Sequence, residues 1–115
     1  MIKLDYSKQI GKKILISEKS KSFCVDVADI THISCEENVS TIYLVNEKNG
    51  LSTVRSLNEF EKEVEEYGGF LRVSQKVLIN VKYFSGFRVV KRKKYIMVHD
   101  TEIVVSKRKS MLFKK

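Results

Sequence analysis

Residues 70–80 read FLRVSQKVLIN, two apolar runs interrupted by the polar residues Ser74, Gln75 and Lys76. The runs are short and consist mainly of Phe, Leu, Val and Ile. Short apolar runs bounded by polar residues are typical of buried β-strands. We therefore expect two strands joined by a polar loop.

Further short runs precede this segment. Turn signals at 18–21, at 36–38 and at Asn49-Gly50 separate them, the last being a strong hairpin signal. The expected strands before residue 56 are Lys13–Ser17, 23–27, Ile30–Cys35, Thr41–Val45 and Ser52–Arg55.

One helix is predicted just before residue 70. Ser56-Leu57-Asn58-Glu59 forms a capping box, and Gly68-Gly69 permits the positive φ angles that end a helix. The apolar side chains of this segment fall on one face, and its glutamates form an acidic face expected to be solvated. The apolar positions are Leu57, Phe60, Val64 and Tyr67, and the acidic ones are Glu59, Glu61, Glu63, Glu65 and Glu66.

The C-terminal third continues the strand pattern. Runs at 87–90 and 95–98 flank a basic turn at 91–94, and 99–101 turn into the run Ile103–Val105. Ser106 could cap a short terminal helix over 106–115. About eight to ten short strands and one clear helix predict a mainly β fold of small stacked antiparallel sheets with short helical turns.

Length and composition indicate one folded domain spanning residues 1–115. With 43% hydrophobic residues the chain can build a core, and no apolar run approaches a membrane span or a signal-peptide core. We therefore expect a cytoplasmic protein without a membrane partner. Cys24 and Cys35 are expected to be buried free thiols, although the sequence leaves a Cys24–Cys35 disulfide open.

Charge is distributed unevenly along the chain. Residues 1–71 carry nine Lys/Arg and twelve Asp/Glu, a net charge of −3, whereas residues 72–115 carry thirteen and two, a net charge of +11. The basic part is also rich in Val, Ile, Phe and Tyr, so it is expected to fold. A basic folded surface favours a polyanionic partner, above all nucleic acid.

No motif for catalysis or cofactor binding is present. His32 and His99 are the only histidines, and neither has a Cys, His or Asp partner at metal-ligand spacing. The sequence contains no nucleophile elbow, P-loop or dinucleotide-binding glycine pattern. We therefore expect no enzyme activity, no cofactor and no metal.

Three donor-rich segments follow or interrupt the strands: 74–76, Lys91-Arg92-Lys93-Lys94 and Ser106-Lys107-Arg108-Lys109. Arg can bind guanine bidentately and Gln can read adenine, while Ser, Lys and backbone N–H groups can hold phosphates. The alternative is that all three are ordinary solvated loops. The basic turn at 91–94 is the least specific, because it could equally contact phosphate, RNA, anionic lipid or a protein.

Three motifs follow one another along the chain: Ser56-Leu57-x-x-Phe60-Glu61, then residues 70–80, then Val104-Val105-Ser106-Lys107-Arg108. In this order they resemble the LytTR family of DNA-binding domains. The resemblance covers roughly residues 12–113. It implies a fold of small stacked sheets that binds double-stranded DNA by loops in successive major grooves. The acidic helix is expected to point away from DNA, because phosphate would repel its glutamates.

The resemblance also implies roles for individual residues. Base contacts would come from Ser40, Ser74, Gln75 and Arg108. Arg72 and Lys76 would support the loop or hold phosphate. The family often has His at position 74 and Arg or Asn at position 75, so base preference does not carry over. The remaining predicted contact residues are Lys91, Arg92, Lys93, Lys107 and Lys109.

Such domains usually follow a receiver domain in bacterial response regulators of two-component systems and regulate transcription from paired direct repeats. The resemblance therefore implies a receiver domain in a longer protein. No heptad or aliphatic surface stripe is present, so we expect the isolated domain to be a monomer. Two alternatives remain: an RNA-binding module with Phe84, Phe87 and Tyr95 as stacking aromatics, and an anionic-surface or protein-interaction module that uses the basic C-terminal part.

Overall fold

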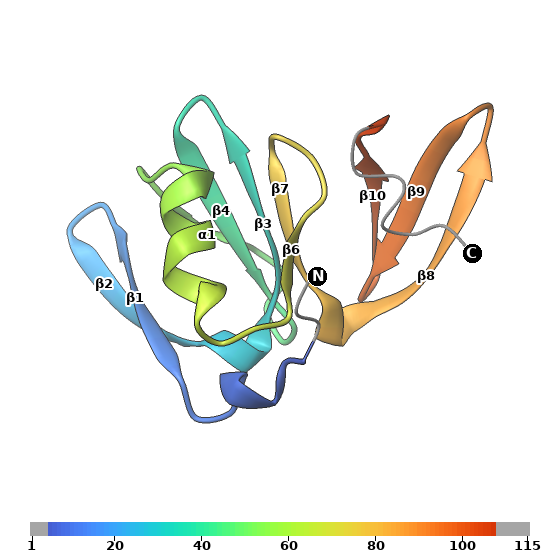
Figure 1. Ribbon diagram of the computed structural model, residues 1–115. Coiled ribbons are helices and arrows are strands. Elements are labelled where there is room, and N and C mark those ends of the chain that lie inside the picture. Colours follow the sequence, from blue (N-terminus) through green and yellow to red (C-terminus); the bar gives the residue numbers. More distant parts are fainter. Residues whose placement is uncertain (1–4, 108–115) are drawn as a thin grey trace.

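The computed structural model describes residues 5–107 and contains three antiparallel sheets, one α-helix and three short 3₁₀ turns within that range (Figure 1). The sheets have the strand orders β1-β2, β5-β4-β3-β7-β6 and β10-β9-β8. The elements are η1 (Ser7–Gln9), β1 (Lys13–Glu18), β2 (Lys21–Asp26), η2 (Val27–Asp29), β3 (Ile30–Glu36), β4 (Val39–Leu44), β5 (Leu51–Thr53), α1 (Leu57–Glu65), β6 (Phe70–Arg72), β7 (Val77–Asn80), η3 (Val81–Tyr83), β8 (Phe84–Val90), β9 (Lys93–Val98) and β10 (Thr101–Val105).

One face of the five-stranded sheet is covered by α1 and by the hairpin β1–β2, as Figure 1 shows. Leu57, Phe60 and Val64 of the helix are buried there, since their spacing places them on one side of α1. They pack against alternate residues of β3 and β4, such as Ile33 and Ile42, which have no exposed surface. This is the larger of the two cores.

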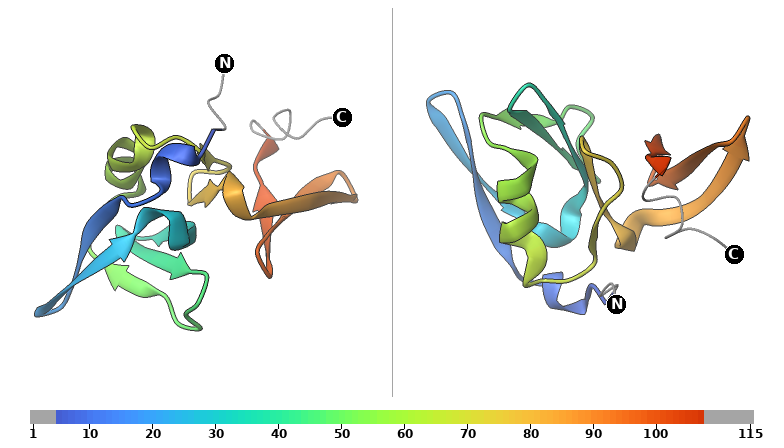
Figure 2. Two further views of the ribbon diagram at one scale, coloured as in Figure 1. Left: turned by 90° about the horizontal axis from the view of Figure 1, so that it is seen from below. Right: turned by 45° about the horizontal axis from the view of Figure 1, so that its top comes forward.

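The three-stranded sheet packs on the opposite face, at the edge formed by β6 and β7. Adjacent residues of β7 serve the two cores, because side chains alternate along a strand: Leu78 faces the helix and Ile79 faces the smaller sheet. Ile96 and Ile103 complete this second core. The hairpin β8–β9 then extends outward beyond the rest of the molecule (Figure 2).

A buried polar network joins the N-terminal segment to the junction of the two cores. Gln9 and Asn80 are both fully buried and exchange two side-chain hydrogen bonds of 3.0 and 2.9 Å. Gln9 also donates to the Gly68 carbonyl at 2.8 Å, and Asn80 donates to the Ile30 carbonyl at 2.9 Å. Gly69 lies against this network with φ of 81°.

The mainly β fold with one clear helix is confirmed, and the helix begins where the capping box predicts, since the Ser56 hydroxyl accepts from the Glu59 N–H at 3.2 Å. The predicted strand Ser52–Arg55 is displaced: β5 ends at Thr53, because residues 54–56 lead into the helix cap.

The expectation that both cysteines are buried is wrong. Both thiols are free, but Cys24 is exposed on the outer face of β2 and Cys35 is half-buried.

Within the described range no helix is both long enough and apolar enough to pass through a bilayer.

Several connections meet at one end of the molecule. In Figure 1 the β3–β4 turn, the β6–β7 loop, the β8–β9 turn and the end of β10 all lie at the top. The first residues of α1 lie on the same side, because the helix runs downward from there. This loop-bearing end gathers most of the predicted contact residues.

Candidate nucleic-acid interface

The loop between β6 and β7 is held by Arg72. Its Nε donates to the Ser74 carbonyl at 2.8 Å and its Nη2 donates to the Gln75 carbonyl at 2.6 Å. The same guanidinium reaches α1, where Nη1 donates to Asn58 Oδ1 and to Glu61 Oε1, both at 2.9 Å. The Arg72 side chain is only 17% exposed. Arg72 therefore supports the loop, as the motif implies.

Backbone hydrogen bonds fix the ends of this loop. The Val73 N–H donates to the Val77 carbonyl at 3.0 Å, and the Cys35 N–H of β3 donates to the Lys76 carbonyl at 2.8 Å. The Ser106 N–H after β10 donates to the Val73 carbonyl at 3.0 Å. One short loop is thus tied to strands from both larger sheets.

Within the loop, the three polar side chains have different positions. The half-buried Ser74 hydroxyl accepts from the Lys76 N–H at 3.2 Å, a local turn that fixes the backbone. Gln75 is exposed at the tip, and Lys76 is exposed and lies 3.3 Å from the Glu36 carboxylate. Such an exposed ion pair contributes little to stability, so the Lys76 ammonium can exchange it for another anion.

The β3–β4 turn corrects one predicted contact. Ser40 lies inside β4 and not in the turn; its side chain has no exposed surface, and its hydroxyl donates to the Arg55 carbonyl at 2.7 Å. A buried hydroxyl with this bond cannot reach a base edge, so the assignment of Ser40 as a base contact is wrong in this structure. The residues at the tip are Glu37 and Asn38, with φ of 48° and 68°, and both are exposed.

Strand alternation could have revealed this arrangement from the sequence. A two-residue turn whose residues both have positive φ is the type I′ hairpin connection, for which Asn is strongly preferred. Placing Glu37-Asn38 in that turn makes residue 39 the first residue of the next strand, and Ser40 then alternates inward with Ile42. Alternation therefore places Ser40 in the core and leaves Asn38 at the exposed tip.

The basic hairpin tip is narrower than predicted. Only Lys91 and Arg92 form the turn, with φ of 49° and 69°, while Lys93 and Lys94 already belong to β9. Lys91, Arg92 and Lys93 are exposed. The half-buried Lys94 has its ammonium 5.0 Å from the centre of the Phe87 ring. Three exposed cations therefore stand at the end of an extended hairpin (Figure 2).

The last predicted contact segment is described only in part. Lys107 is exposed just beyond β10. Arg108, Lys109 and most of the predicted terminal helix lie outside the described residues.

The acidic face of α1 is not simply solvated. Glu61 holds Arg72, while Glu59 and Glu63 hold Arg55 through contacts of 3.4 and 2.7 Å.

At the loop-bearing end, exposed carboxylates stand on the β3–β4 turn and exposed cations on the 74–76 loop and the β8–β9 hairpin. Positive charge therefore increases from β3 toward β9 across this end of the molecule.

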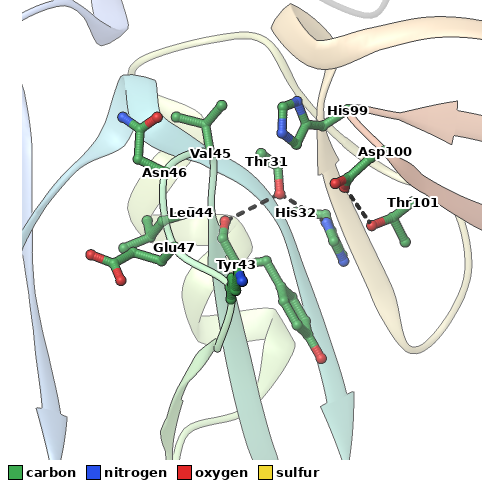
Figure 3. Close-up of a pocket in the computed structure, with 11 residues that line it drawn as sticks. Thr31, His32, Tyr43, Leu44, Val45, Asn46, Glu47, His99, Asp100 and Thr101 are labelled. Carbon is green, nitrogen blue, oxygen red and sulfur yellow. Dashed lines mark hydrogen bonds between the residues drawn. The ribbon is translucent and has the colours of Figure 1, made fainter.

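A cleft opens between β3–β4 and the β9–β10 turn, on the face opposite α1 (Figure 3). His32 stacks on Tyr43 with ring centres 4.4 Å apart, and His99 and Asp100 line the other side. Burial lowers the pKa of His32 from 6.5 to about 4, and the Asp100 carboxylate opposes this shift only partly. At neutral pH His32 is therefore uncharged.

The described residues favour neither a metal site nor a stacking site for single-stranded RNA. Among residues 5–107, no group of three His, Cys, Asp or Glu side chains is arranged to hold a metal ion. Phe84 and Phe87 pack against the second core, and Tyr95 lies under the Arg88 guanidinium at 5.1 Å. These aromatics do not form an open stacking platform of the kind that single-stranded RNA requires.

Comparison with known proteins gives the family. Residues 20–115 match the sequence model described as the LytTr DNA-binding domain. No curated protein sequence matches the chain. Among solved structures, the chain is similar to the LytTr DNA-binding domain of a putative methyl-accepting/DNA response regulator from Bacillus cereus, with 15% identity and a TM-score of 0.72 over 90% of this chain and 94% of that one. The family match covers most of the sequence, and the chain therefore belongs to the LytTR family of DNA-binding domains.

Proposed function

We propose that this domain binds double-stranded DNA sequence-specifically in transcription regulation, by inserting its β3–β4 turn and its 74–76 loop into major grooves. The observation that carries this proposal is that hydrogen bonds hold the β3–β4 hairpin and the 74–76 loop to each other and to the sheet. The Cys35 N–H bonds the Lys76 carbonyl at 2.8 Å, and Arg72 fixes the carbonyls of residues 74 and 75. Side chains at the tips are thereby presented on a stiff support, as base reading requires.

Base reading is assigned to the side chains at the tips. Gln75 and Asn38 are exposed amides, and an amide can bond the N6 and N7 edge of adenine bidentately. Asn38 thus takes the place first given to Ser40. The Ser74 hydroxyl lies beside Gln75 and can contact a base or phosphate, and Arg108 is retained as a guanine reader on the motif alone.

Phosphate binding is assigned to the exposed cations. Phosphate contacts supply most of the affinity of such domains and fix the register of the protein on DNA. Phosphate contacts need long, mobile cationic side chains more than they need fine orientation, which suits the tip of a hairpin. The exposed residues are Lys76, Lys91, Arg92, Lys93 and Lys107, and Lys109 is retained on the sequence alone.

The wider assembly follows from the family. We propose that the domain is the output module of a two-component response regulator, that it is a monomer in isolation, and that two copies occupy direct repeats about one helical turn apart. Head-to-tail placement on direct repeats requires no two-fold axis in the protein.

A salt titration tests duplex binding. About four to six phosphate contacts give a slope of log affinity against log salt near −4 to −5. The affinity for a duplex should exceed that for the same single strand. A slope near zero would contradict binding through phosphate contacts, and a preference for the single strand would favour the RNA-binding alternative.

A pair of variants tests the reassignment from Ser40 to Asn38. Asn38→Gly removes the amide, and glycine adopts the positive φ of this position without strain. We expect it to lose discrimination at one base pair, by roughly 1–3 kcal/mol, with unchanged stability. Ser40→Ala, the control, should lower stability by about 1–2 kcal/mol and leave base preference unchanged. The reverse pattern would restore Ser40 as the contact residue.

A further inference from the structure

The first turn of α1 lies beside the 74–76 loop, and Arg72 connects the two. Its Nη1 donates to Asn58 and Glu61 of the helix, while its Nε and Nη2 donate to the carbonyls of Ser74 and Gln75. We infer that Asn58 and Glu61 are positioning residues for DNA reading: they hold Arg72 on the loop, and Arg72 holds Gln75 at the tip. This inference rests on the proposed function.

The helix is itself fixed by its core contacts. Leu57, Phe60 and Val64 are buried, and the Ser56 cap sets the first residue of the helix. Side chains three positions apart lie on one helical face, so Asn58 and Glu61 point together toward Arg72. The helix therefore acts as a rigid support, although its acidic surface is unfavourable for contact with phosphate.

The charge of Glu61 has a specific role here. Arg72 is a cation only 17% exposed, next to a loop that is proposed to meet a phosphate backbone. Without a carboxylate partner, the Arg72 guanidinium would be stabilised by turning toward a DNA phosphate. Arginine binds phosphate with the same forked geometry as carboxylate. That turn would release the carbonyls of Ser74 and Gln75. Glu61 thus keeps Arg72 in its supporting role.

Two other glutamates of the helix, Glu59 and Glu63, pair with a different arginine. Glu63 accepts from Arg55 at 2.7 Å, and Arg55 lies 4.1 Å from the centre of the Phe60 ring. Within the described residues Glu63 makes no hydrogen bond to the 74–76 loop, yet it has the same charge as Glu61, lies on the same helix and also pairs with an arginine. Glu63 is consequently a matched control for Glu61.

The consequence concerns selectivity more than general affinity. A loop that must be ordered on binding loses affinity for its target, because the ordering cost is taken from the binding free energy. Non-specific binding depends on phosphate contacts and does not need Gln75 in one orientation. Loss of Glu61 should therefore weaken binding to the target duplex and spare binding to a scrambled one.

The experiment compares Glu61→Ala and Glu63→Ala on a selected duplex and on its scrambled counterpart. Each variant removes one negative charge near DNA, which on electrostatic grounds alone tightens binding to every duplex. We expect Glu61→Ala to bind the selected duplex about five- to tenfold more weakly and the scrambled duplex unchanged or more tightly. Glu63→Ala should bind both duplexes unchanged or more tightly.

Amide hydrogen exchange gives a second readout that does not depend on affinity. In Glu61→Ala the Lys76 N–H, which donates to the Ser74 hydroxyl inside the loop, should exchange faster than in the wild type, whereas in Glu63→Ala its exchange should not change. Urea unfolding of both variants shows whether the fold is retained.

The outcomes separate the inference from the function on which it rests. If the wild type does not discriminate the selected duplex from the scrambled one, the proposed function fails. If the wild type discriminates and Glu61→Ala behaves like Glu63→Ala in binding and in exchange, the positioning role is overturned and Glu61 acts only through its charge. Arg72→Lys should reproduce the selectivity loss of Glu61→Ala, because an ammonium cannot bridge the helix and both carbonyls.

Discussion

Folding stability should depend on pH through His32. Its side chain is 6% exposed and stacks on Tyr43, and burial lowers its pKa from 6.5 to about 4. Between these two values the unfolded chain binds a proton that the folded chain does not. The contribution of neutral His32 is therefore fully present above pH 6.5 and is lost as the pH falls toward 4.

The size of the effect follows from the shift. A change of one pKa unit corresponds to about 1.4 kcal/mol, so acidification from pH 6.5 to 4 should cost on the order of 2–3 kcal/mol of the free energy of unfolding. Protonation of carboxylates adds to this loss in every variant. The contribution of His32 is therefore measured as the difference in pH-dependent loss of unfolding free energy between the wild type and His32→Gln.

Urea unfolding at half-unit steps of pH measures this difference. The wild type should lose more stability than His32→Gln between pH 6.5 and 4, whatever their relative stability at pH 7. His99→Gln is the control, because it removes an imidazole from the same cleft and leaves the His32–Tyr43 stack intact. Parallel pH profiles for the wild type and His32→Gln would refute the reasoning.

Three further predictions concern packing, charge and assembly. In thermal unfolding, Gly69→Ala should lower the free energy of unfolding by about 2–4 kcal/mol, because φ is 81° and the new Cβ would lie 2.7 Å from Gln9 Nε2. The control Gly11→Ala, at φ of 77° with open space around it, should lower it by only about 1 kcal/mol. Lys93→Ala should weaken selected and scrambled duplexes equally and make the salt slope shallower by about one. Sedimentation without DNA should show a monomer at micromolar concentration; a stable dimer that prefers inverted repeats would contradict the assembly.

The sequence was sufficient where local pattern and burial agree. The two apolar runs in residues 70–80 predicted β6, the loop and β7, and the capping box predicted the first residue of α1. Both signals are local: a buried strand needs a short apolar run bounded by polar residues, and a cap needs one hydroxyl at one position.

The sequence was insufficient where a contact between distant residues determines the position and role of a side chain. The role of Ser40 depends on a hydrogen bond to Arg55, fifteen residues away, and on a turn that shifts its register. Likewise, nothing local in the sequence shows that Glu61 pairs with Arg72, eleven residues away, while Glu63 pairs with Arg55. Cys24 was misjudged because the outer face of a two-stranded hairpin is not covered, although its residues are partly apolar.

Selection of bound duplexes from a random pool tests the central claim most directly. The account predicts that the wild type enriches one motif, present as direct repeats about one helical turn apart. Gln75→Ala should relax one position of that motif while the other positions persist. Enrichment of no motif by the wild type, or an identical motif from Gln75→Ala, would contradict base reading by the 74–76 loop.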